Sequence, residues 1–207
     1  MTATSEPATA SPRVTARRQR RREQILRAAL LSFRDRGYHA TTLDDIAGRV
    51  GIRNTALYHY FPDKEAILFA CHQESLAEVE QILEAARLEA TPLAALRHAI
   101  EAHVQVMTER LQGSPMAFEV TALHPDHQSE VIARRDRYEQ GLRHLVMEGI
   151  NQGQLTPVDP KVAVFAILGA INWVARWYRP GGSTPGTIIG RQFADHLLEG
   201  LTCHTPR

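Results

Sequence analysis

Side chains suited to reading DNA bases are concentrated in one short stretch of the sequence. The segment GIRNTALYHYFPDK, residues 51–64, begins with a glycine and carries Arg53, Asn54 and Thr55 in succession. An arginine can pair with guanine, an asparagine with adenine, and a threonine methyl group can contact thymine. We interpret these three residues as candidate base contacts, and His59 as a further contact to a base or a phosphate.

The spacing around this stretch predicts the two helices that would position it. Ala47 is small enough for two helices to cross closely, and Gly51, four residues later, supplies a tight turn. A second helix is expected over residues 53–61, with Ile52 and Leu57 on the side that packs inward. This is the helix-turn-helix arrangement, whose second helix enters the major groove of DNA. About eight residues give a rod of roughly 12 Å, comparable with the width of that groove.

The first third of the chain is basic. Residues 1–64 carry 12 Lys or Arg against 6 Asp or Glu, whereas residues 65–207 carry 12 against 17. This change of sign favours a polyanionic partner for the first part, although an uneven surface without function would look the same. Five arginines lie within RRQRRR at residues 17–22, among them Arg20 and Arg21. We interpret them as an arm that orders along a DNA groove; the alternative is a solvated helix start, where cations oppose the helix dipole.

Composition places the chain among ordinary globular proteins. Its 207 residues are 43% hydrophobic and 23% charged, enough for one large domain or two small ones that share a core. The two cysteines are far apart, which gives no disulfide framework and suits a reducing cytosol. The sequence has no apolar signal region and no run of roughly 20 apolar residues. We therefore expect a cytoplasmic protein with no membrane partner.

The rest of the sequence is helical in pattern almost throughout, without a convincing strand pair or repeat. Thr42 followed by Asp45 predicts a capped helix start, and Asp63 before an apolar run predicts another. A later helix is expected from about Ser129 to Asn151. The expected fold is all-α with about nine helices. A disordered tail, a helix-turn-helix DNA-binding domain, and a ligand-binding and dimerisation domain are expected over residues 1–16, 17–63 and 64–207, respectively.

A wider pattern surrounds the predicted helix-turn-helix, in GYHATTLDDIAGRVGIRNTALYHYFPDKEAIL at residues 37–68. Its characteristic residues are Gly37, Tyr38, Thr42, Ile46, Ala47, Gly51, Leu57, Tyr58, Tyr60, Phe61, Lys64 and Glu65. With these features the segment closely resembles the DNA-binding region of the TetR family of bacterial transcriptional regulators. The resemblance is specific over residues 22–68 and looser, through length and helix count, over the rest of the chain.

This resemblance implies roles for individual residues. Hydroxyl groups at a helix start and an ammonium group beside a groove suit contacts to phosphates. The residues implied as phosphate contacts are Thr42, Tyr58, Tyr60 and Lys64. Two positions depart from the commonest family pattern: Arg53 stands where a serine is usual, and Thr55 where glycine is frequent. Both departures concern the operator sequence and leave the expectation of DNA binding unchanged.

The resemblance also implies a homodimer and a ligand pocket. In the family the last two helices form a four-helix bundle with those of the partner, so that two reading helices meet a double-stranded, palindromic operator. The middle helices enclose a pocket for a small molecule. Candidate lining residues are Val104, Met107, Leu111, Met116, Phe118 and Leu142.

One face of the penultimate helix is unusually rich in indole and polar groups. Asn172, Trp173, Arg176 and Trp177 recur at helical spacing and therefore share a face. Two indoles could hold a flat or acyl group while Arg176 meets an anion. The segment resembles that of TetR-family regulators of lipid or sterol catabolism, some of which respond to acyl-CoA thioesters. The same face could equally be a dimer interface, and the sequence leaves both interpretations open.

Together these features predict a ligand-responsive transcriptional regulator, a repressor released from its operator by an inducer such as an acyl-CoA thioester. The alternatives are a drug-efflux regulator of the same family with another hydrophobic ligand, and a protein that coats DNA without sequence preference. An enzyme is not expected, because the sequence has no G-x-S-x-G motif and no glycine-rich dinucleotide fingerprint. No cofactor is expected, and His124, Asp126 and His127 are only weak candidates for a metal site.

Overall fold

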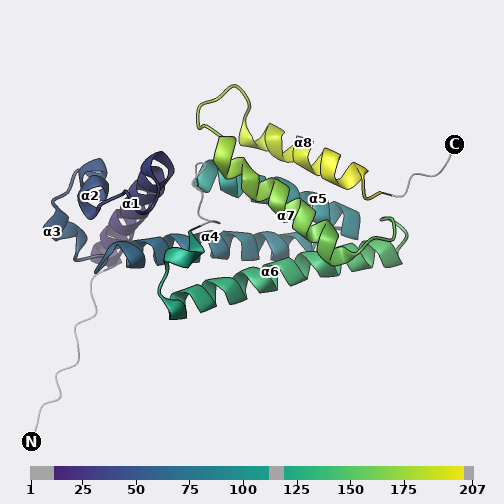
Figure 1. Ribbon diagram of the computed structural model, residues 1–207, viewed down its shortest axis with the longest axis horizontal. Coiled ribbons are helices and arrows are strands. Elements are labelled where there is room, and N and C mark those ends of the chain that lie inside the picture. The colour runs from purple at the N-terminus through teal and green to yellow at the C-terminus, as the bar shows by residue number, and fades with distance from the viewer. Residues whose placement is uncertain (1–11, 112–118, 203–207) are drawn as a thin grey trace, which may run out of the picture.

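The computed structural model describes residues 12–111 and 119–202. Its fold is all-α, as predicted, with a small helical group at one end and an elongated helical bundle at the other (Figure 1). Within the described residues, the one β feature is a single bridge between Leu155 and Thr202. The helices are α1 (Pro12–Arg36), α2 (Leu43–Val50), α3 (Asn54–Leu57), α4 (Lys64–Ala86), α5 (Pro92–Gln105), the π-helix η1 (Val106–Arg110), the 3₁₀ helix η3 (Val120–Ala122), α6 (Pro125–Asn151), α7 (Pro160–Trp177) and α8 (Gly186–Glu199).

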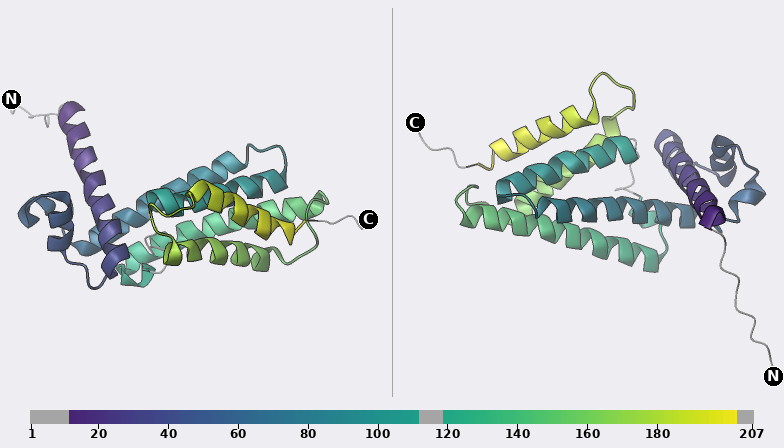
Figure 2. Two further views of the ribbon diagram at one scale, coloured as in Figure 1. Left: turned by 90° about the horizontal axis from the view of Figure 1, so that it is seen from above. Right: turned by 180° about the vertical axis from the view of Figure 1, so that it is seen from behind.

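Helix α4 connects the two parts of the molecule. Its first turns pack against α1, and the rest of it lies in the bundle between α5 and α6 (Figure 1). The apolar stripe expected along it is buried, including Ile67, Cys71 and Ala86. Helix α7 packs against α6 and α5, and α8 lies along α5 on the outside of the bundle (Figure 2). No helix in residues 12–111 or 119–202 is long and apolar enough to cross a membrane.

The short connections of the first three helices follow from local sequence, and the predictions for them are confirmed. Thr42 and Asp45 form a capping box, in which each side chain accepts the backbone N–H of the other residue. Gly37 and Gly51 take the left-handed conformation that ends α1 and α2, with φ of 79° and 75°. Asp63 caps α4 by accepting from the Ala66 N–H at 2.7 Å. These caps satisfy backbone groups that the helix ends would otherwise leave unpaired.

Three helix boundaries differ from those expected. Helix α1 begins at Pro12, so residues 12–16, expected to be disordered, are helical, and residues 1–11 lie outside the described part. Helix α3 ends at Leu57 after one turn, and residues 58–60 continue as hydrogen-bonded turns. Helix α6 begins at Pro125 and not near residue 129, because proline suits the first helical position.

Two glycines allow α8 to lie close to its neighbours. A Cβ atom on Gly190 would stand 3.0 Å from the Glu101 carbonyl oxygen of α5. A Cβ atom on Gly186 would stand 2.0 Å from the Thr108 hydroxyl oxygen of η1. Side chains at these positions would push α8 away, so the glycines set the distance at which it packs on the bundle.

Two histidines are buried inside the bundle in their neutral form. His72 of α4 is 1% exposed and His103 of α5 is 7% exposed. Burial, together with the charge of Arg135, lowers the pKa of His72 to about 3. Burial lowers the pKa of His103 to about 4. In the unfolded chain both groups return to the ordinary value of about 6.5, so they couple folding to pH.

We predict that acidification below pH 6.5 destabilises the protein through these histidines. The unfolded chain then binds protons that the folded protein excludes, so the free energy of unfolding falls by up to about 1.4 kcal/mol per pH unit for each group. Urea unfolding between pH 7 and 5 measures this slope. His72→Gln should reduce it, whereas His196→Gln, at an exposed position, should leave it unchanged; equal slopes for all three proteins would refute the assignment.

Candidate functional site

The residues predicted to read DNA lie on the outer side of the helix-turn-helix. Arg53, Thr55 and His59 are exposed, and Tyr58 is 52% exposed. Asn54 differs from this expectation. It is half-buried, and its Oδ1 atom is buried without a hydrogen-bond partner. A bidentate contact to adenine needs both amide atoms, so in this rotamer Asn54 cannot make the predicted base contact.

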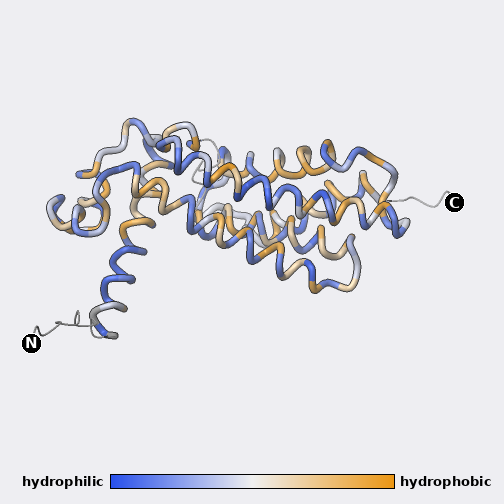
Figure 3. The backbone as a smooth tube through the Cα atoms, turned by 90° about the horizontal axis from the view of Figure 1, so that it is seen from below, coloured by the Kyte–Doolittle hydropathy of each residue, from blue (hydrophilic) through white to orange (hydrophobic). Residues whose placement is uncertain are grey.

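A basic groove runs between α3 and the first turns of α1. Its volume is about 620 Å³, and its lining residues are Arg17, Arg18, Arg21, Ile52, Ala56, His59 and Tyr60. The cationic side chains of α1 therefore flank the same space as the outer face of α3. Figure 3 shows the first turns of α1 as a hydrophilic rod that projects from the body of the molecule. Arg20 is also exposed but lies outside the groove lining.

The arginine-rich stretch, expected to be an arm that orders on DNA, is already helical in this structure. Residues 17–22 are continuous with the rest of α1, whose apolar side packs on the helix-turn-helix and α4. Arg22 is held where α1 packs against α4 and the residues before it. Its guanidinium lies 5.1 Å from the centre of the Phe61 ring and 3.4 Å from Glu74. The later turns of α1 are held by packing, and the helix continues from them toward the N-terminus through the basic residues.

Lys64 makes contacts that the sequence did not predict. Its Nζ atom donates to the carbonyl oxygens of Tyr38 and Thr41 at 2.8 Å and of His39 at 3.2 Å, and it lies 4.4 Å from the centre of the Tyr38 ring. An ammonium group has three N–H donors, and all three are used within the protein. The expected phosphate contact of Lys64 is therefore at odds with this structure, in which Lys64 fixes the turn between α1 and α2 to the start of α4.

Thr42, Tyr58 and Tyr60 remain as candidate phosphate contacts, and Tyr58 is exposed. Thr42 is exposed, but its hydroxyl already donates to the Asp45 carboxylate at 2.8 Å within the capping box. Tyr60 is half-buried at the edge of the basic groove.

Arg36 contacts Asp45 at 2.5 Å, and the pKa of Asp45 is lowered mainly by hydrogen bonds from the Thr42 backbone and side chain. These contacts hold the first turn of α2, at the opposite end of the helix from the turn at Gly51.

The start of α6 is fixed to α4 by Glu65. Its carboxylate accepts from the His124 backbone N–H at 3.0 Å and lies 2.9 Å from Nδ1 of His127. The His127 ring also stacks on Phe69 of α4, with ring centres 3.7 Å apart. These contacts account for the two histidines that were weak candidates for metal binding. Among the described residues, no group of three or more His, Cys, Asp or Glu side chains could hold a metal ion.

A cavity of about 290 Å³ lies inside the bundle, between α4, α5, α6 and α7. Its apolar wall and its polar groups come from different helices, so a ligand would contact several elements at once. The π-helix η1 contributes Met107 to the wall, and π-helical turns frequently occur at functional sites. The lining residues are Ser75, Leu76, Val79, His103, Met107, Leu111, Arg135, Asp136, Tyr138, Glu139, Leu168 and Asn172.

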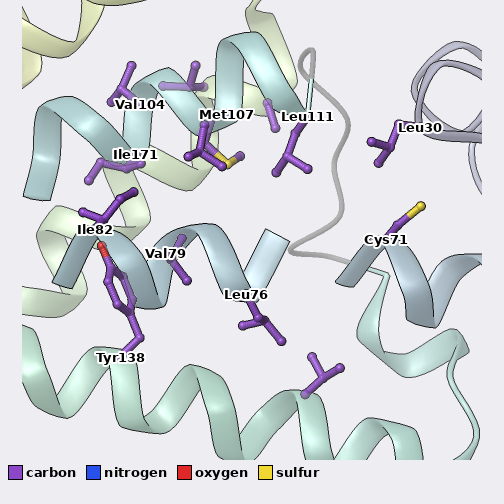
Figure 4. Packing of buried hydrophobic residues seen from close by; sticks show 14 of the residues in the cluster. Leu30, Cys71, Leu76, Val79, Ile82, Val104, Met107, Leu111, Tyr138 and Ile171 are labelled. Carbon is purple, nitrogen blue, oxygen red and sulfur yellow. The ribbon is translucent and has the colours of Figure 1, made fainter. Parts of the chain in front are cut away.

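The cavity contains some of the predicted ligand residues and not others. Met107, Leu111 and Asn172 line it, as expected. Val104 and Leu142 are buried but are core residues outside the lining, and Figure 4 shows Val104 within the packed cluster. The remaining two candidates, Met116 and Phe118, lie outside the described residues.

Six polar residues of the cavity were missed: Ser75, His103, Arg135, Asp136, Tyr138 and Glu139. They stand on amphipathic helices at positions where a core side chain would also fit. Tyr138 lies four residues before Leu142 on the buried stripe of α6, so the helical period alone could have placed it inside. Nothing in the sequence indicated that His103 of α5 would be its neighbour, 35 positions away.

The two tryptophans of α7 point away from the cavity. Trp173 is 59% and Trp177 is 45% exposed, and Arg176 is exposed beside them. Trp177 stacks on Phe193 of α8, with ring centres 6.4 Å apart. The expectation that Trp173, Arg176 and Trp177 line a ligand pocket is therefore wrong for this cavity, because these residues share an outward face and only Asn172 turns inward.

Replacing Lys64 tests its contacts with the turn between α1 and α2. Lys64→Met keeps the length of the side chain but leaves three carbonyl oxygens without their charged donor. We expect the free energy of unfolding to fall by about 1–3 kcal/mol in urea titrations. The same change at the exposed Lys161 should alter it by less than about 0.5 kcal/mol. Equal effects at the two positions would contradict a structural role for Lys64.

Family models match both parts of the chain. One, described as bacterial regulatory proteins of the tetR family, matches residues 25–71, which include the helix-turn-helix and the start of α4. Another, described as a tetracyclin repressor-like C-terminal domain, matches residues 89–201, which include the cavity residues of α5, α6 and α7. The boundary between the two matches falls within and just after α4, the helix that connects the two parts.

Relatives with the same architecture are transcriptional regulators and not enzymes. The HTH-type transcriptional repressor KstR2 of Rhodococcus jostii (strain RHA1) is 32% identical and matches over 90% of this chain and 94% of that protein. The structure of the ketosteroid transcriptional regulator KstR2 of Mycobacterium tuberculosis has a TM-score of 0.82 at 27% identity, covering 89% and 96% of the two chains. The crystal structure of AibR with isovaleryl coenzyme A and operator DNA has a TM-score of 0.76 at 28% identity, covering 88% and 98%. With both parts matched, this chain belongs to the TetR family of bacterial transcriptional regulators.

Proposed function

We propose that this protein is a repressor that binds a palindromic operator as a homodimer and leaves it when a small-molecule inducer enters the bundle cavity. The observation that carries the proposal is the groove in which Arg17, Arg18 and Arg21 of α1 face the same space as His59, which lies in the turn after α3. Cationic side chains beside a helix with exposed polar residues match what DNA recognition requires: phosphate contacts for position and base contacts for sequence. Binding to operator DNA also implies a cytoplasmic location.

The exposed apolar face of α7 and α8 supports the homodimer. Val162, Phe165 and Trp173 lie on one side of α7, and Ile188 of α8 is also exposed. Gly169 lies in the same helix at an exposed position with open space around its Cα atom, so a partner helix could approach closely there. A contiguous apolar surface of this kind marks an interface more often than a free surface.

The cavity supports an inducer with an apolar body and a few polar groups. AibR, whose structure contains isovaleryl coenzyme A, makes an acyl-CoA thioester the first ligand to consider. A volume of about 290 Å³ is at the lower end of the range for ligand sites. It suits an acyl group, with the coenzyme A portion outside the cavity. An inducer can release DNA only by binding the DNA-free conformation more tightly than the DNA-competent one.

A mobility-shift titration tests the DNA-binding role. The protein should bind DNA from upstream of its own gene about a thousandfold more tightly than random DNA. Arg53→Ala should cost about 1–3 kcal/mol on that site alone. Arg18→Ala should weaken binding to both DNAs. It should also reduce the slope of log affinity against log salt concentration by about 0.9 for each phosphate that the arginine neutralises.

The matched control is Arg87→Ala, at an exposed position just after the far end of α4. It should change neither affinity nor salt dependence. Equal affinity of the wild type for both DNAs would support a coating protein and contradict the operator, whereas loss of binding in Arg87→Ala would place the DNA on another surface.

If the apolar face of α7 forms the dimer interface, placing a charge on this face should dissociate the dimer. Trp173→Glu places a carboxylate in the proposed interface twice, once from each protomer. We expect the dimer dissociation constant to rise about a thousandfold, as measured by sedimentation. Leu88→Glu, at an 87% exposed leucine between α4 and α5, should have no effect. A wild-type protein that sediments as a monomer at micromolar concentration would contradict the proposal.

A further inference from the structure

A neutral pair of polar side chains lies in the cavity wall. Nδ1 of His103 from α5 is 3.1 Å from Oη of Tyr138 from α6. Their rings meet edge to face, with centres 5.5 Å apart. Both residues are buried and both line the cavity. In Figure 4 the Tyr138 side chain extends from α6 toward α4, where Ile82 and Val79 lie.

The protonation of this pair leaves it without charge. Burial lowers the pKa of His103 to about 4 and raises the pKa of Tyr138. Near pH 7 the pair is therefore an imidazole and a phenol, which together have two hydrogen-bond donors. One donor is used between them. In one tautomer the other is Nε2–H of His103, and in the other tautomer it is the hydroxyl of Tyr138. Either way the pair has one N–H or O–H left for an acceptor on a ligand.

The other charged groups of the cavity disfavour a negatively charged ligand. Among the described lining residues Arg135 is the single cation. Of the two carboxylates, Asp136 is exposed and Glu139 is already paired with Arg143, which lies outside the lining. A buried carboxylate on the ligand would add a further negative charge, which is costly without a dedicated cation. A neutral carbonyl oxygen needs only a donor, which the pair supplies. The apolar residues Leu76, Val79 and Met107 then remain for the hydrocarbon part.

We infer that the cavity recognises the uncharged carbonyl group of an acyl ligand through His103 and Tyr138, and so distinguishes a thioester or ester from the free carboxylate. This inference rests on the proposed function, because it assigns the chemistry of the inducer to the same cavity. The protein would thereby respond to an activated acyl group and ignore the corresponding acid. A site built to donate to a carbonyl also rejects an analogue without that oxygen, because its donor is then left unpaired.

The test uses three probes that share one acyl chain, over chains of about four to twelve carbons. Each chain is prepared as the N-acetylcysteamine thioester, as the free carboxylate, and as the thioether that lacks the carbonyl oxygen. N-acetylcysteamine removes the charged phosphates of coenzyme A, so that only the acyl group is compared. Affinity is measured by titration calorimetry, and release of operator DNA is measured in parallel by mobility shift.

For the chain that binds best, the thioester should bind about tenfold more tightly than either the carboxylate or the thioether. Tyr138→Phe or His103→Phe, whichever removes the free donor, should lower the ratio of thioester to thioether affinity several-fold while thioether affinity changes little. Tyr178→Phe, which removes a phenol hydroxyl outside the cavity lining, should leave the ratio unchanged. His103→Phe provides a second variant if Tyr138→Phe does not fold, and retained DNA binding shows that each variant is folded.

Tighter binding of the carboxylate, or an unchanged ratio in Tyr138→Phe and His103→Phe, would overturn the inference. If a carboxylate binds the cavity and releases DNA, the proposed function survives and only the chemistry assigned to the pair is wrong. If no probe binds or releases DNA, both the acyl inducer and the inference fail. Failure to bind DNA without any probe would instead count against the DNA-binding role itself.

Discussion

The first turn of α4 holds the two parts of the molecule together. Lys64 donates to three carbonyl oxygens of the turn between α1 and α2, and its neighbour Glu65 accepts from the start of α6. Two adjacent residues thus join the helix-turn-helix and the cavity-forming bundle to the same end of one helix. Helix α6 also carries Tyr138 into the cavity. A shift of α6 relative to α4 must therefore either move the helix-turn-helix or break these hydrogen bonds, and under the proposed function this would give a ligand a mechanical connection to the DNA-binding part.

The interior of the bundle contains three polar side chains that carry no charge. His72, His103 and Tyr138 are buried, and the pKa shifts that burial imposes keep all three uncharged near neutral pH. Neutral groups can be buried at the cost of a single hydrogen bond, whereas an unpaired charge would destabilise the fold far more. Arg135 lies near His72 and lines the cavity, and its charge contributes to the lowered pKa of His72. The cavity therefore combines a neutral hydrogen-bonding pair with the charged residues Arg135, Asp136 and Glu139 in its lining.

How much of the structure the sequence could predict depended on how far apart the interacting residues lie along the chain. The capping box of Thr42 and Asp45 and the turn at Gly51 involve neighbours, and local rules were sufficient for them. The partners of Lys64 lie 23 to 26 positions away, and those of His103 lie 35 away. Such contacts depend on how the helices pack, which no local pattern contains. The early start of α6 differs, because Pro125 is a local signal for a first helical position, and the contact from Glu65, 59 positions away, adds to it.

Helix α7 shows a second limit of sequence patterns. Asn172 and Trp173 are adjacent, yet one lines the cavity and the other is exposed on the outer face. Helical spacing groups side chains on a face but does not state what that face meets, so the tryptophans fitted a ligand site and an interface equally well. Because successive residues are about 100° apart, a single helix one layer thick must serve both surfaces. In the proposed dimer, a ligand that displaces Asn172 would therefore act on the same rigid rod that presents Trp173 to the partner, which would link occupation of the cavity to the separation of the two protomers' DNA-binding parts.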